Sequence, residues 1–213
     1  MPPPNAVIVA DGRVALAAPA REEFVERWPL FNDPLLSMAL GAPAAPPDPA
    51  ARAMPPVLRG QREALYEAHV ARDVLIFEIR LTEDGRCVGE AYLSGVAWPR
   101  ASADVALLIL SPDDRRRGLG TEAARLLCAY AFDGLGLNRL TARFPSDNVA
   151  AVAAMRRAAP GSGAREVGIE RHGEWAFGRH VDAACWELLR EDFPPHPATE
   201  ELRQPPTSVT AQV

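Results

Sequence analysis

The decisive part of the sequence reads Arg115-Arg116-Arg117-Gly118-Leu119-Gly120-Thr121. It follows a continuous apolar run of strand length, 104–110 (DVALLIL), which is typical of a strand covered on both faces. It precedes residues 119–130, where apolar side chains recur at helical spacing. The two glycines let the backbone approach a ligand closely, and a helix beginning here offers unpaired N–H groups with positive dipole character. With three arginines beside them, these groups predict a site for a phosphate or pyrophosphate.

Outside this stretch, apolar patterns predict a mixture of strands and helices. The predicted strands cover 14–18, 73–81, 87–94, 104–110, 139–144, 164–171 and 179–189. The predicted helices cover 21–28, 58–72, 119–130 and 149–159, with a weak helical turn at 35–40. We expect His172-Gly173-Glu174 to join the last two strands. The pattern is that of a mixed α/β (α+β) domain.

Prolines divide the chain, because fourteen of the 21 fall near the two ends and in one internal segment. Proline fixes φ and removes a backbone donor, so these segments are poor interiors for helices or strands. We expect an N-terminal extension over 1–13, one domain over 14–193 with a Pro-rich internal loop at 41–56, and a disordered tail over 194–213.

Composition excludes several classes of function. All 23 basic residues are arginine, so a lysine nucleophile or Schiff base is excluded. The net charge of −5 argues against nucleic acid as a partner. No apolar run approaches the roughly 18 residues of a membrane span, and residues 1–13 do not read as a signal peptide. Three widely spaced cysteines, Cys87, Cys128 and Cys185, predict neither disulfides nor a paired-cysteine metal site, so we expect a reducing, cytoplasmic setting.

The motif Arg115-x-x-Gly118-x-Gly120 after a strand resembles the acyl-CoA signature of the GNAT superfamily of N-acetyltransferases. The resemblance to the superfamily continues through 121–127, 130–132, 135–140 and the asparagine-bearing loop 145–150. Four segments resemble its ribosomal-protein N-terminal acetyltransferase branch: 26–28, 32–34, 178–182 and 188–192. The similarity covers roughly residues 14 to 193. It implies a twisted mixed sheet of about seven strands flanked by helices, with a splay between the fourth and fifth strands.

The resemblance also implies roles for individual residues. Acetyl-CoA, or another acyl-CoA, would be the co-substrate, without a metal. The coenzyme-binding residues would be Leu108, Ile109, Leu110, Arg115, Arg116, Arg117, Gly118, Leu119, Gly120, Thr121 and Asn148. In this pattern the backbone N–H groups from Arg116 to Thr121 hold the pyrophosphate, and the Leu108–Leu110 strand edge pairs with the pantetheine arm. An amine would attack the thioester directly, without a covalent enzyme intermediate.

The chain departs from the family pattern where side chains would supply acid catalysis. Ala151 stands where the branch often has a serine near the thiolate, and helix 149–159 contains no tyrosine. The glutamate of the next strand is displaced, since Glu166 and Val167 precede Gly168. Because a thiolate is a tolerable leaving group, positioning alone can carry much of the catalysis.

Two carboxylates are candidate catalytic groups, and two aromatic residues are candidates for the acceptor pocket. Asp104 would accept the amine proton, or would be a strand-end residue bonded to its neighbours. Glu90 would face the acceptor cleft, or would point outward by strand alternation. Tyr92 lies on the same face as Glu90 and would line the pocket or the core. Trp28 would line the acceptor cleft or pack.

Histidine provides no stronger candidate. His172 is expected in an exposed turn, and the role of His180 is open. The four histidines have no carboxylate or cysteine partners at ligand spacing, so no metal site is predicted.

Three hypotheses follow for the function. The first is an acyl-CoA-dependent N-acyltransferase that acetylates a primary amine on a protein N-terminus, a small metabolite or an antibiotic. The second is a CoA-binding module with little catalysis, and the third is a succinyl or longer-acyl transferase. The partners expected are an acyl-CoA and an amine, and a homodimer is one option for the assembly.

Overall fold

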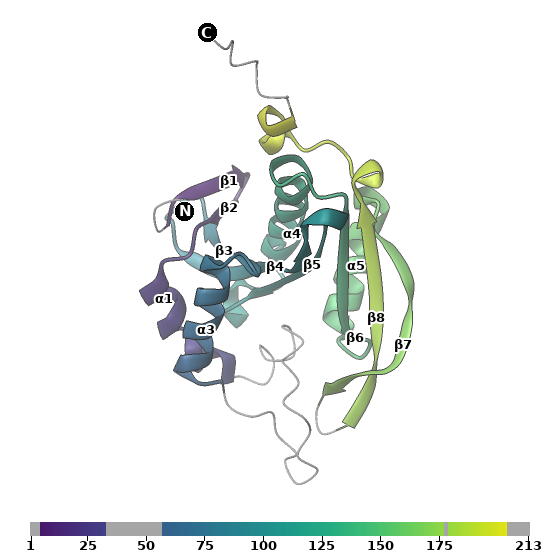
Figure 1. Cartoon of the computed structure of the whole chain (residues 1–213), viewed down its shortest axis with the longest axis horizontal. Coiled ribbons are helices and arrows are strands. Elements are labelled where there is room, and N and C mark those ends of the chain that lie inside the picture. The colour runs from purple at the N-terminus through teal and green to yellow at the C-terminus, as the bar shows by residue number, and fades with distance from the viewer. Residues whose placement is uncertain (1–4, 33–56, 177–178, 204–213) are drawn as a thin grey trace.

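The computed structural model describes residues 5–32, 57–176 and 179–203 (Figure 1). The predicted helical turn at 35–40 and the predicted loop at 41–56 lie outside the described residues. Within the described ranges, no helix is both long and apolar enough to cross a membrane.

A single mixed sheet forms the centre of the molecule. Its strands are β1 (Val7–Asp11), β2 (Val14–Ala17), β3 (Val74–Leu81), β4 (Cys87–Ala97), β5 (Ser102–Ile109), β6 (Arg139–Pro145), β7 (Arg165–Ala176) and β8 (Arg179–Leu189). They lie in the order β1-β2-β3-β4-β5-β6-β8-β7. Every neighbouring pair is antiparallel except β5 and β6, which are parallel.

The sheet has one strand more than predicted, because residues 7–11 belong to it rather than to an extension. This strand, β1, forms a hairpin with β2 through Gly12, whose φ of 56° lies in the left-handed region. The side chain of Val9 is buried against the main core. The preceding prolines and Asp11 conceal this short strand in the sequence.

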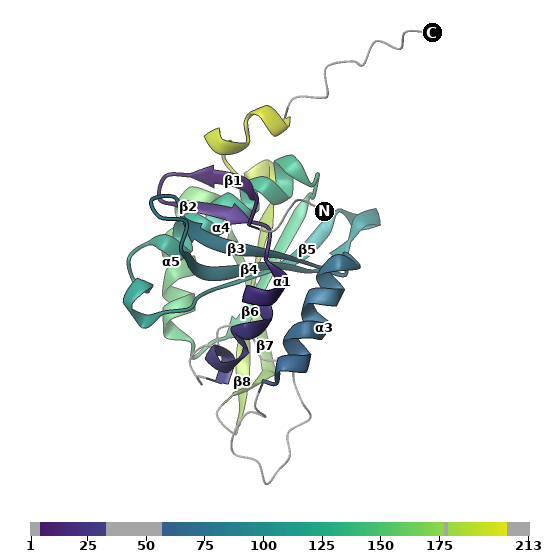
Figure 2. The ribbon, with the colours of Figure 1, turned by 90° about the vertical axis from the view of Figure 1, so that its left-hand side faces the viewer.

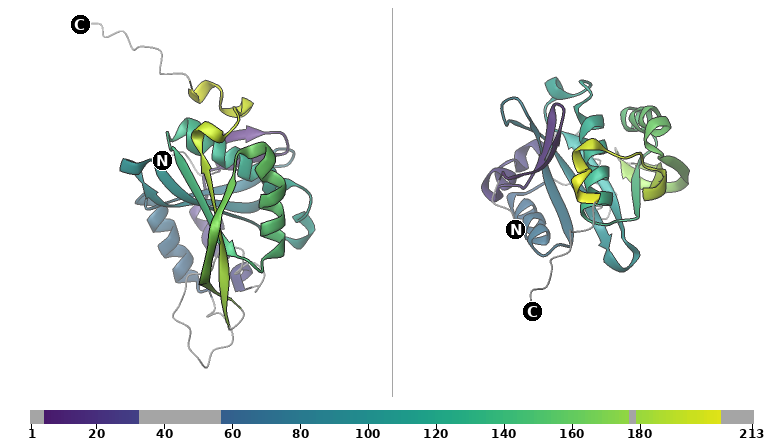
Figure 3. Two further views of the ribbon diagram at one scale, coloured as in Figure 1. Left: turned by 90° about the vertical axis from the view of Figure 1, so that its right-hand side faces the viewer. Right: turned by 90° about the horizontal axis from the view of Figure 1, so that it is seen from above.

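Helices cover both faces of the sheet. On one face lie α1 (Arg21–Glu26), a 3-10 turn (Trp28–Asn32) and α3 (Arg59–Val70), which Figure 2 shows in front of the strands. On the other lie α4 (Leu119–Ala129), which continues into a π-helical turn (Tyr130–Gly134), and α5 (Val149–Ser162) beside the long β7–β8 ribbon (Figure 3).

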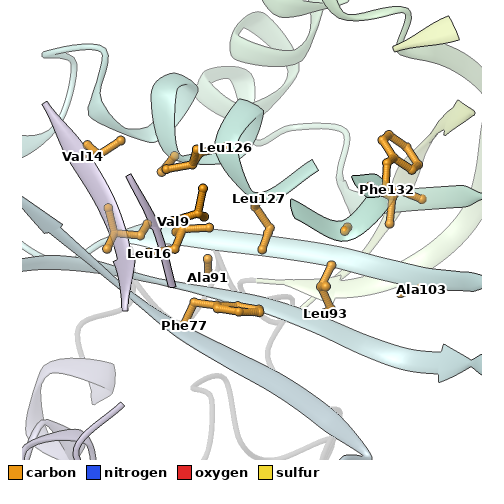
Figure 4. Packing of buried hydrophobic residues seen from close by; sticks show 14 of the residues in the cluster. Val9, Val14, Leu16, Phe77, Ala91, Leu93, Ala103, Leu126, Leu127 and Phe132 are labelled. Atoms are coloured by element: carbon orange, nitrogen blue, oxygen red, sulfur yellow. The ribbon is translucent and has the colours of Figure 1, made fainter. Parts of the chain in front are cut away.

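Strand alternation divides the buried apolar side chains between these two layers. The larger cluster packs Phe77, Ala91 and Leu93 of the sheet against Leu126 and Leu127 of α4 (Figure 4). The smaller cluster packs the opposite face of the same strands against α1 and α3, with Phe24, Phe31, Tyr66, Val74, Ile76, Tyr92 and Leu108 as its buried members. Burial of one such side chain contributes about 1.5–3 kcal/mol, so both layers stabilise the position of β4 and β5.

The ladder between β5 and β6 stops early. Its pairs are Ser102↔Arg139, Ala103↔Leu140 and Asp104↔Thr141, although both strands continue past these residues. Beyond Asp104 and Thr141 the two strands have no backbone pairing with each other in the described part of the chain. These are the fourth and fifth strands of the sequence prediction, so the predicted splay is present.

Two predictions at the C-terminal side were wrong. Residues 172–174 are not the hairpin connection, because β7 continues to Ala176 with a register shift between Glu170 and Glu174 that accommodates His172 at φ 53°. Residues 194–203 are not disordered: they form helical turns at Pro197–Thr199 and Glu201–Arg203. Polar contacts with Asp133 hold this segment, because its carboxylate accepts hydrogen bonds from Thr199 and Arg203. Residues 204–213 lie outside the described residues.

Candidate active site

The loop between β5 and α4 has an unusual backbone. Arg116 has φ 59° and Gly118 has φ 87°, so both adopt the left-handed conformation. That conformation costs a residue with a Cβ atom about 1–2 kcal/mol, which explains the glycine directly before α4. Arg116 adopts this conformation despite its Cβ atom, and its side chain is exposed. The loop therefore turns sharply between β5 and α4.

Intramolecular contacts hold the arginines around this loop, with one exception. Arg115 donates from Nε to the carbonyl oxygen of Ile109 at 3.1 Å and from Nη2 to that of Leu110 at 3.1 Å. Arg13, in the β1–β2 turn, forms an ion pair with Glu122 and donates to the carbonyl oxygen of Arg117 at 3.0 Å. Arg116 is different, because its guanidinium has no partner in the described part of the chain.

Asp114 fixes the base of the loop. Its side chain is 3% exposed and accepts two hydrogen bonds from Arg86, of 2.7 and 3.0 Å, and one from Arg117 of 3.0 Å. The bonds from Arg86, and then its charge, lower the pKa of Asp114 below its ordinary value. The carboxylate thus stays ionised and joins the β3–β4 turn to the loop.

A row of backbone donors is left without acceptors. The first helix bonds of α4 are made by Thr121 and Glu122, whose N–H groups donate to the carbonyl oxygen of Gly118. In the described ranges, the N–H groups of residues 116–120 have no hydrogen-bond acceptor. Such donors at a helix N-terminus favour an anion.

The exposed edge of β5 lies next to this row, but its register differs from the prediction. The N–H of Leu110 donates to Val88 of β4, and antiparallel alternation then turns the backbone groups of Leu108 toward β4 as well. The backbone groups of Leu107 and Ile109 face the side where β6 has diverged. The N–H groups that could meet an extended ligand are therefore those of Leu107 and Ile109, whereas Leu108 and Leu110 were predicted to share this role.

These features lie in a chain that matches a known family. A family model described as an acetyltransferase (GNAT) domain matches residues 13–159, which are more than half of the chain. The chain belongs to the GNAT acetyltransferase family. No curated protein sequence matches it.

Solved structures share the fold of this GNAT domain. A spermidine N-acetyltransferase from Vibrio cholerae, in complex with CoA and spermine, has a TM-score of 0.70 at 17% identity, covering 85% of this chain and 98% of that one. A ribosomal-protein-S5-alanine acetyltransferase from Vibrio fischeri has a TM-score of 0.65 at 14% identity, covering 87% and 98%. The sheet with its diverging strands is thus a GNAT sheet, and the enzyme is an acetyltransferase.

Asp104 occupies the closed end of the gap between β5 and β6 in this GNAT domain. It is exposed, and it belongs to the last pair of the β5–β6 ladder. The hydroxyl of Thr141, its pairing partner, donates to Asp104 Oδ1. Asp104 is thus bonded to a neighbouring residue, and it lies where the two strands part.

Glu90 does not point to solvent and does not lie free in a cleft. Its side chain is fully buried, and Oε1 accepts hydrogen bonds from Arg27 at 2.9 Å and from Arg62 at 2.7 Å. The hydroxyl of Tyr92 donates to the other oxygen. Both carboxylate oxygens of Glu90 therefore accept hydrogen bonds between the sheet and helices α1 and α3. This corrects both sequence hypotheses, a position in the acceptor cleft and an outward-pointing side chain.

Tyr92 belongs to the same buried network rather than to an open pocket. It is 5% exposed, and its hydroxyl also accepts a hydrogen bond of 3.2 Å from Arg62. Burial, and then the charge of Glu90, raise the pKa of Tyr92 well above its ordinary value, so it remains a hydrogen-bond donor. Of the two alternatives that the sequence left open for Tyr92, the structure agrees with the core, because the pairing of β4 directs this side chain into the helical layer.

Sequence reasoning missed the rest of this network. Glu78 of β3 is fully buried and pairs with Arg27 and Arg80. Arg62 stacks over the rings of Phe24, at 3.5 Å, and Phe31, at 4.2 Å. The signal available in the sequence was a charged residue inside each of two apolar strands, Glu78 and Glu90, at positions that alternation places on one face.

Asn148 caps helix α5. Its side-chain Oδ1 accepts a hydrogen bond of 3.1 Å from the N–H of Ala151, and its carbonyl oxygen accepts one from Val152. The Nδ2 group has no partner among the described residues and is available to a ligand. In the same loop, the buried Oγ of Ser146 also has no partner in the described ranges.

Trp28 begins the 3-10 turn after α1 and is half-buried. Leu119 is the first residue of α4 and its side chain is buried, whereas Thr121 is exposed on the first turn of this helix. The rings of His172 and His180 stack 6.0 Å apart on the β7–β8 ribbon. Among the described residues, no group of three or more His, Cys, Asp or Glu side chains could hold a metal ion.

Proposed function

We propose that this enzyme transfers an acetyl group from acetyl-CoA to a primary amine, by direct attack of the amine on the thioester. The observation that supports this most is that a gap between two strands and a row of unpaired backbone N–H groups lie along the same strand, β5. The β5–β6 ladder ends after Asp104↔Thr141, and the unpaired N–H groups of residues 116–120 lie just beyond the far end of β5. One ligand with a diphosphate and an extended amide-bearing arm would fit both.

The coenzyme would lie along β5. Its pyrophosphate would accept hydrogen bonds from the N–H groups of residues 116–120, and Arg116 would add the guanidinium of this loop that has no partner in the described part of the chain. Its pantetheine amides would pair with the backbone of Leu107 and Ile109, which adds a partial strand to the exposed edge. The thioester would then lie near Asp104.

Two of the three cysteines are unsuited to forming a covalent enzyme intermediate, which is consistent with direct transfer. Burial raises the pKa of Cys87 to about 11 and that of Cys128 to about 12, so neither thiol supplies a thiolate nucleophile at neutral pH. In the proposed reaction the amine nitrogen bonds to the carbonyl carbon, the carbon–sulfur bond breaks, and the thiolate takes a proton from solvent. The carboxylate of Asp104 accepts the proton that the amine gives up.

The acceptor is proposed as a primary amine of unspecified size. Spermine is bound to one GNAT enzyme of the same fold, and alanine of ribosomal protein S5 is the acceptor named for another. A CoA-binding module without catalysis and a succinyl transferase are the alternatives to be tested. Ala151 motivates the module, because the residue three places after Asn148 has no group to protonate the leaving thiolate.

We also propose a cytoplasmic location, and a homodimer as one option for the assembly beside a monomer. The three cysteines are free, as expected in a reducing compartment. Light scattering at micromolar concentration distinguishes a homodimer from a monomer.

The test combines calorimetry with thiol release. Acetyl-, succinyl- and free CoA are titrated first, and thiol release is then measured over a panel of primary amines. A Cβ atom at Gly120 would lie 3.6 Å from the side chains of Ile109 and Leu107, which is ordinary contact, so Gly120→Ala should keep both the fold and the binding. Gly120→Glu adds a negative charge beside the free N–H groups and should weaken binding at least tenfold. Equal affinity of both variants would contradict the phosphate site.

A further inference from the structure

A bulge in β4 lies directly beside the Asp104 carboxylate. The register between β4 and β5 shifts between Ser94 and Ala97, and Gly95 within the bulge has φ 56°. A Cβ atom at Gly95 would lie 3.1 Å from Asp104 Oδ2, closer than side chains normally pack. The absence of a side chain there keeps Oδ2 accessible from the β4 side.

Thr141 occupies the other side of the same carboxylate. Its hydroxyl donates to Asp104 Oδ1, across the last pair of the β5–β6 ladder. The remaining oxygen, Oδ2, has no hydrogen-bond partner in the described part of the chain. The charged side chains on the same face of β6 and β8 are Arg139, Arg143 and Glu187. Arg139 pairs with Glu187 at 3.1 Å, and Arg143 pairs with Glu170 and Glu174 of β7. No described cation pairs with Asp104.

We propose that Thr141 is a positioning residue for acetyl transfer: it holds one oxygen of Asp104 so that the other, cleared by Gly95, receives the proton of the acceptor amine. This inference rests on the proposed function and adds to it the atom that acts and the two residues that orient it. β4, β5 and β6 each contribute one residue to this arrangement, which we call the carboxylate seat: Gly95, Asp104 and Thr141.

The carboxylate seat accounts for the protons that the acceptor nitrogen loses during acetyl transfer. An acceptor arrives as an ammonium ion and loses one proton to become nucleophilic, and its nitrogen loses a second when the amide forms. Oδ2 of Asp104 accepts protons from the nitrogen and passes them to solvent, while Thr141 keeps Oδ1 bonded throughout. The departing thiolate takes one proton from solvent, so the net products are the amide, CoA thiol and one proton.

A double-mutant cycle tests the seat in the full chain. Thr141→Val removes the donor at nearly constant volume and should lower kcat about tenfold, while the KM for acetyl-CoA changes less than twofold. Thr141→Ser restores the hydroxyl and should restore kcat. In an Asp104→Asn background, Thr141→Val should have no further effect, because the two residues act through one carboxylate. Thr82→Val is the matched control, since it removes a hydroxyl that donates to Gly12 far from the seat.

A glycine pair tests the other side of the carboxylate. Gly95→Ala and Gly85→Ala both introduce a Cβ at a left-handed φ, of 56° and 72° respectively. Only Gly95 faces Asp104, whereas a Cβ atom at Gly85 would meet nothing within 4 Å. We expect Gly95→Ala to lower kcat about tenfold beyond Gly85→Ala.

The outcomes separate the two proposals. Suppose that the wild type releases thiol with an amine. If Thr141→Val then leaves kcat unchanged, or lowers kcat by the same factor in the wild type and in the Asp104→Asn background, the role of the carboxylate seat is contradicted and the proposed function stands. If the wild type binds acetyl-CoA and transfers to no amine in the panel, the proposed function fails, and the seat with it.

Discussion

Two regions of this GNAT domain are rich in arginine, and they differ in whether their polar groups have hydrogen-bond partners within the protein. Between β3–β4 and helices α1 and α3, Arg27 and Arg62 meet the buried carboxylates of Glu78 and Glu90, and every carboxylate oxygen there accepts a hydrogen bond. In the loop before α4, Arg116 and the N–H groups of residues 116–120 have no partner in the described part of the chain.

The difference separates a structural network from a binding site. A buried charge must find its partners within the protein, because an unpaired one costs several kcal/mol. An exposed backbone donor is solvated by water and can exchange that water for a ligand at small cost. The number of arginines does not distinguish the two regions. What distinguishes them is whether their polar groups have hydrogen-bond partners within the protein.

The largest expected effect comes from opening the buried network. Glu90→Ala removes an acceptor from both Arg27 and Arg62 and should lower the free energy of unfolding by about 3–5 kcal/mol, measured by urea denaturation. Glu63→Ala is the control, because Glu63 pairs with the exposed Arg59 and should cost about 1 kcal/mol or less. Equal losses in the two variants would remove the contrast between buried and exposed pairs.

A smaller effect is expected on coenzyme binding. Arg116→Gly should weaken acetyl-CoA binding about tenfold, because it removes the unpaired guanidinium at the phosphate site, with little loss of stability since glycine tolerates φ 59°. Arg72→Gly is closely matched: Arg72 is also an exposed arginine, with φ 65°, at the end of α3. Calorimetry should find normal affinity in Arg72→Gly. A tenfold loss there too would assign the effect to net charge rather than to the loop.

The smallest effect is a pH dependence in the α3 layer. Past the end of β2, the N–H of Ile76 donates to His69 Nδ1 at 3.1 Å. Burial lowers the pKa of His69 below 6.5, partly opposed by the carbonyl of Val74. The unfolded chain then binds the proton first, so stability is full above about pH 6.5 and falls as the pH drops below it.

His69→Asn keeps an acceptor oxygen but cannot be protonated in this range. Thermal denaturation between pH 5 and 8 should show a fall in Tm on the acidic side for the wild type, and a flatter curve for His69→Asn. Parallel curves would show that protonation of His69 does not matter to the fold.

Much of the fold could be predicted because its signals are local. Residues 104–110 are apolar enough to form a covered strand, and the glycines and apolar spacing after them specify a turn and an amphipathic helix. Local signals are weak where the segment is short or flanked by proline, which is why β1 and the turns at 197–203 were missed. They also misplace connections, as at His172, where a bulge resembles a hairpin turn.

By itself, the sequence determined the strand–loop–helix unit with its exposed donors, because such a unit needs no partner distant in the chain. The tertiary structure alone decided that Glu90 is buried between two arginines and that Gly95, Asp104 and Thr141 meet. Those contacts depend on strand register, and register is specified by packing over the whole sheet: a shift of one residue would turn the side chains of Glu90, Asp104 and Thr141 to the opposite face.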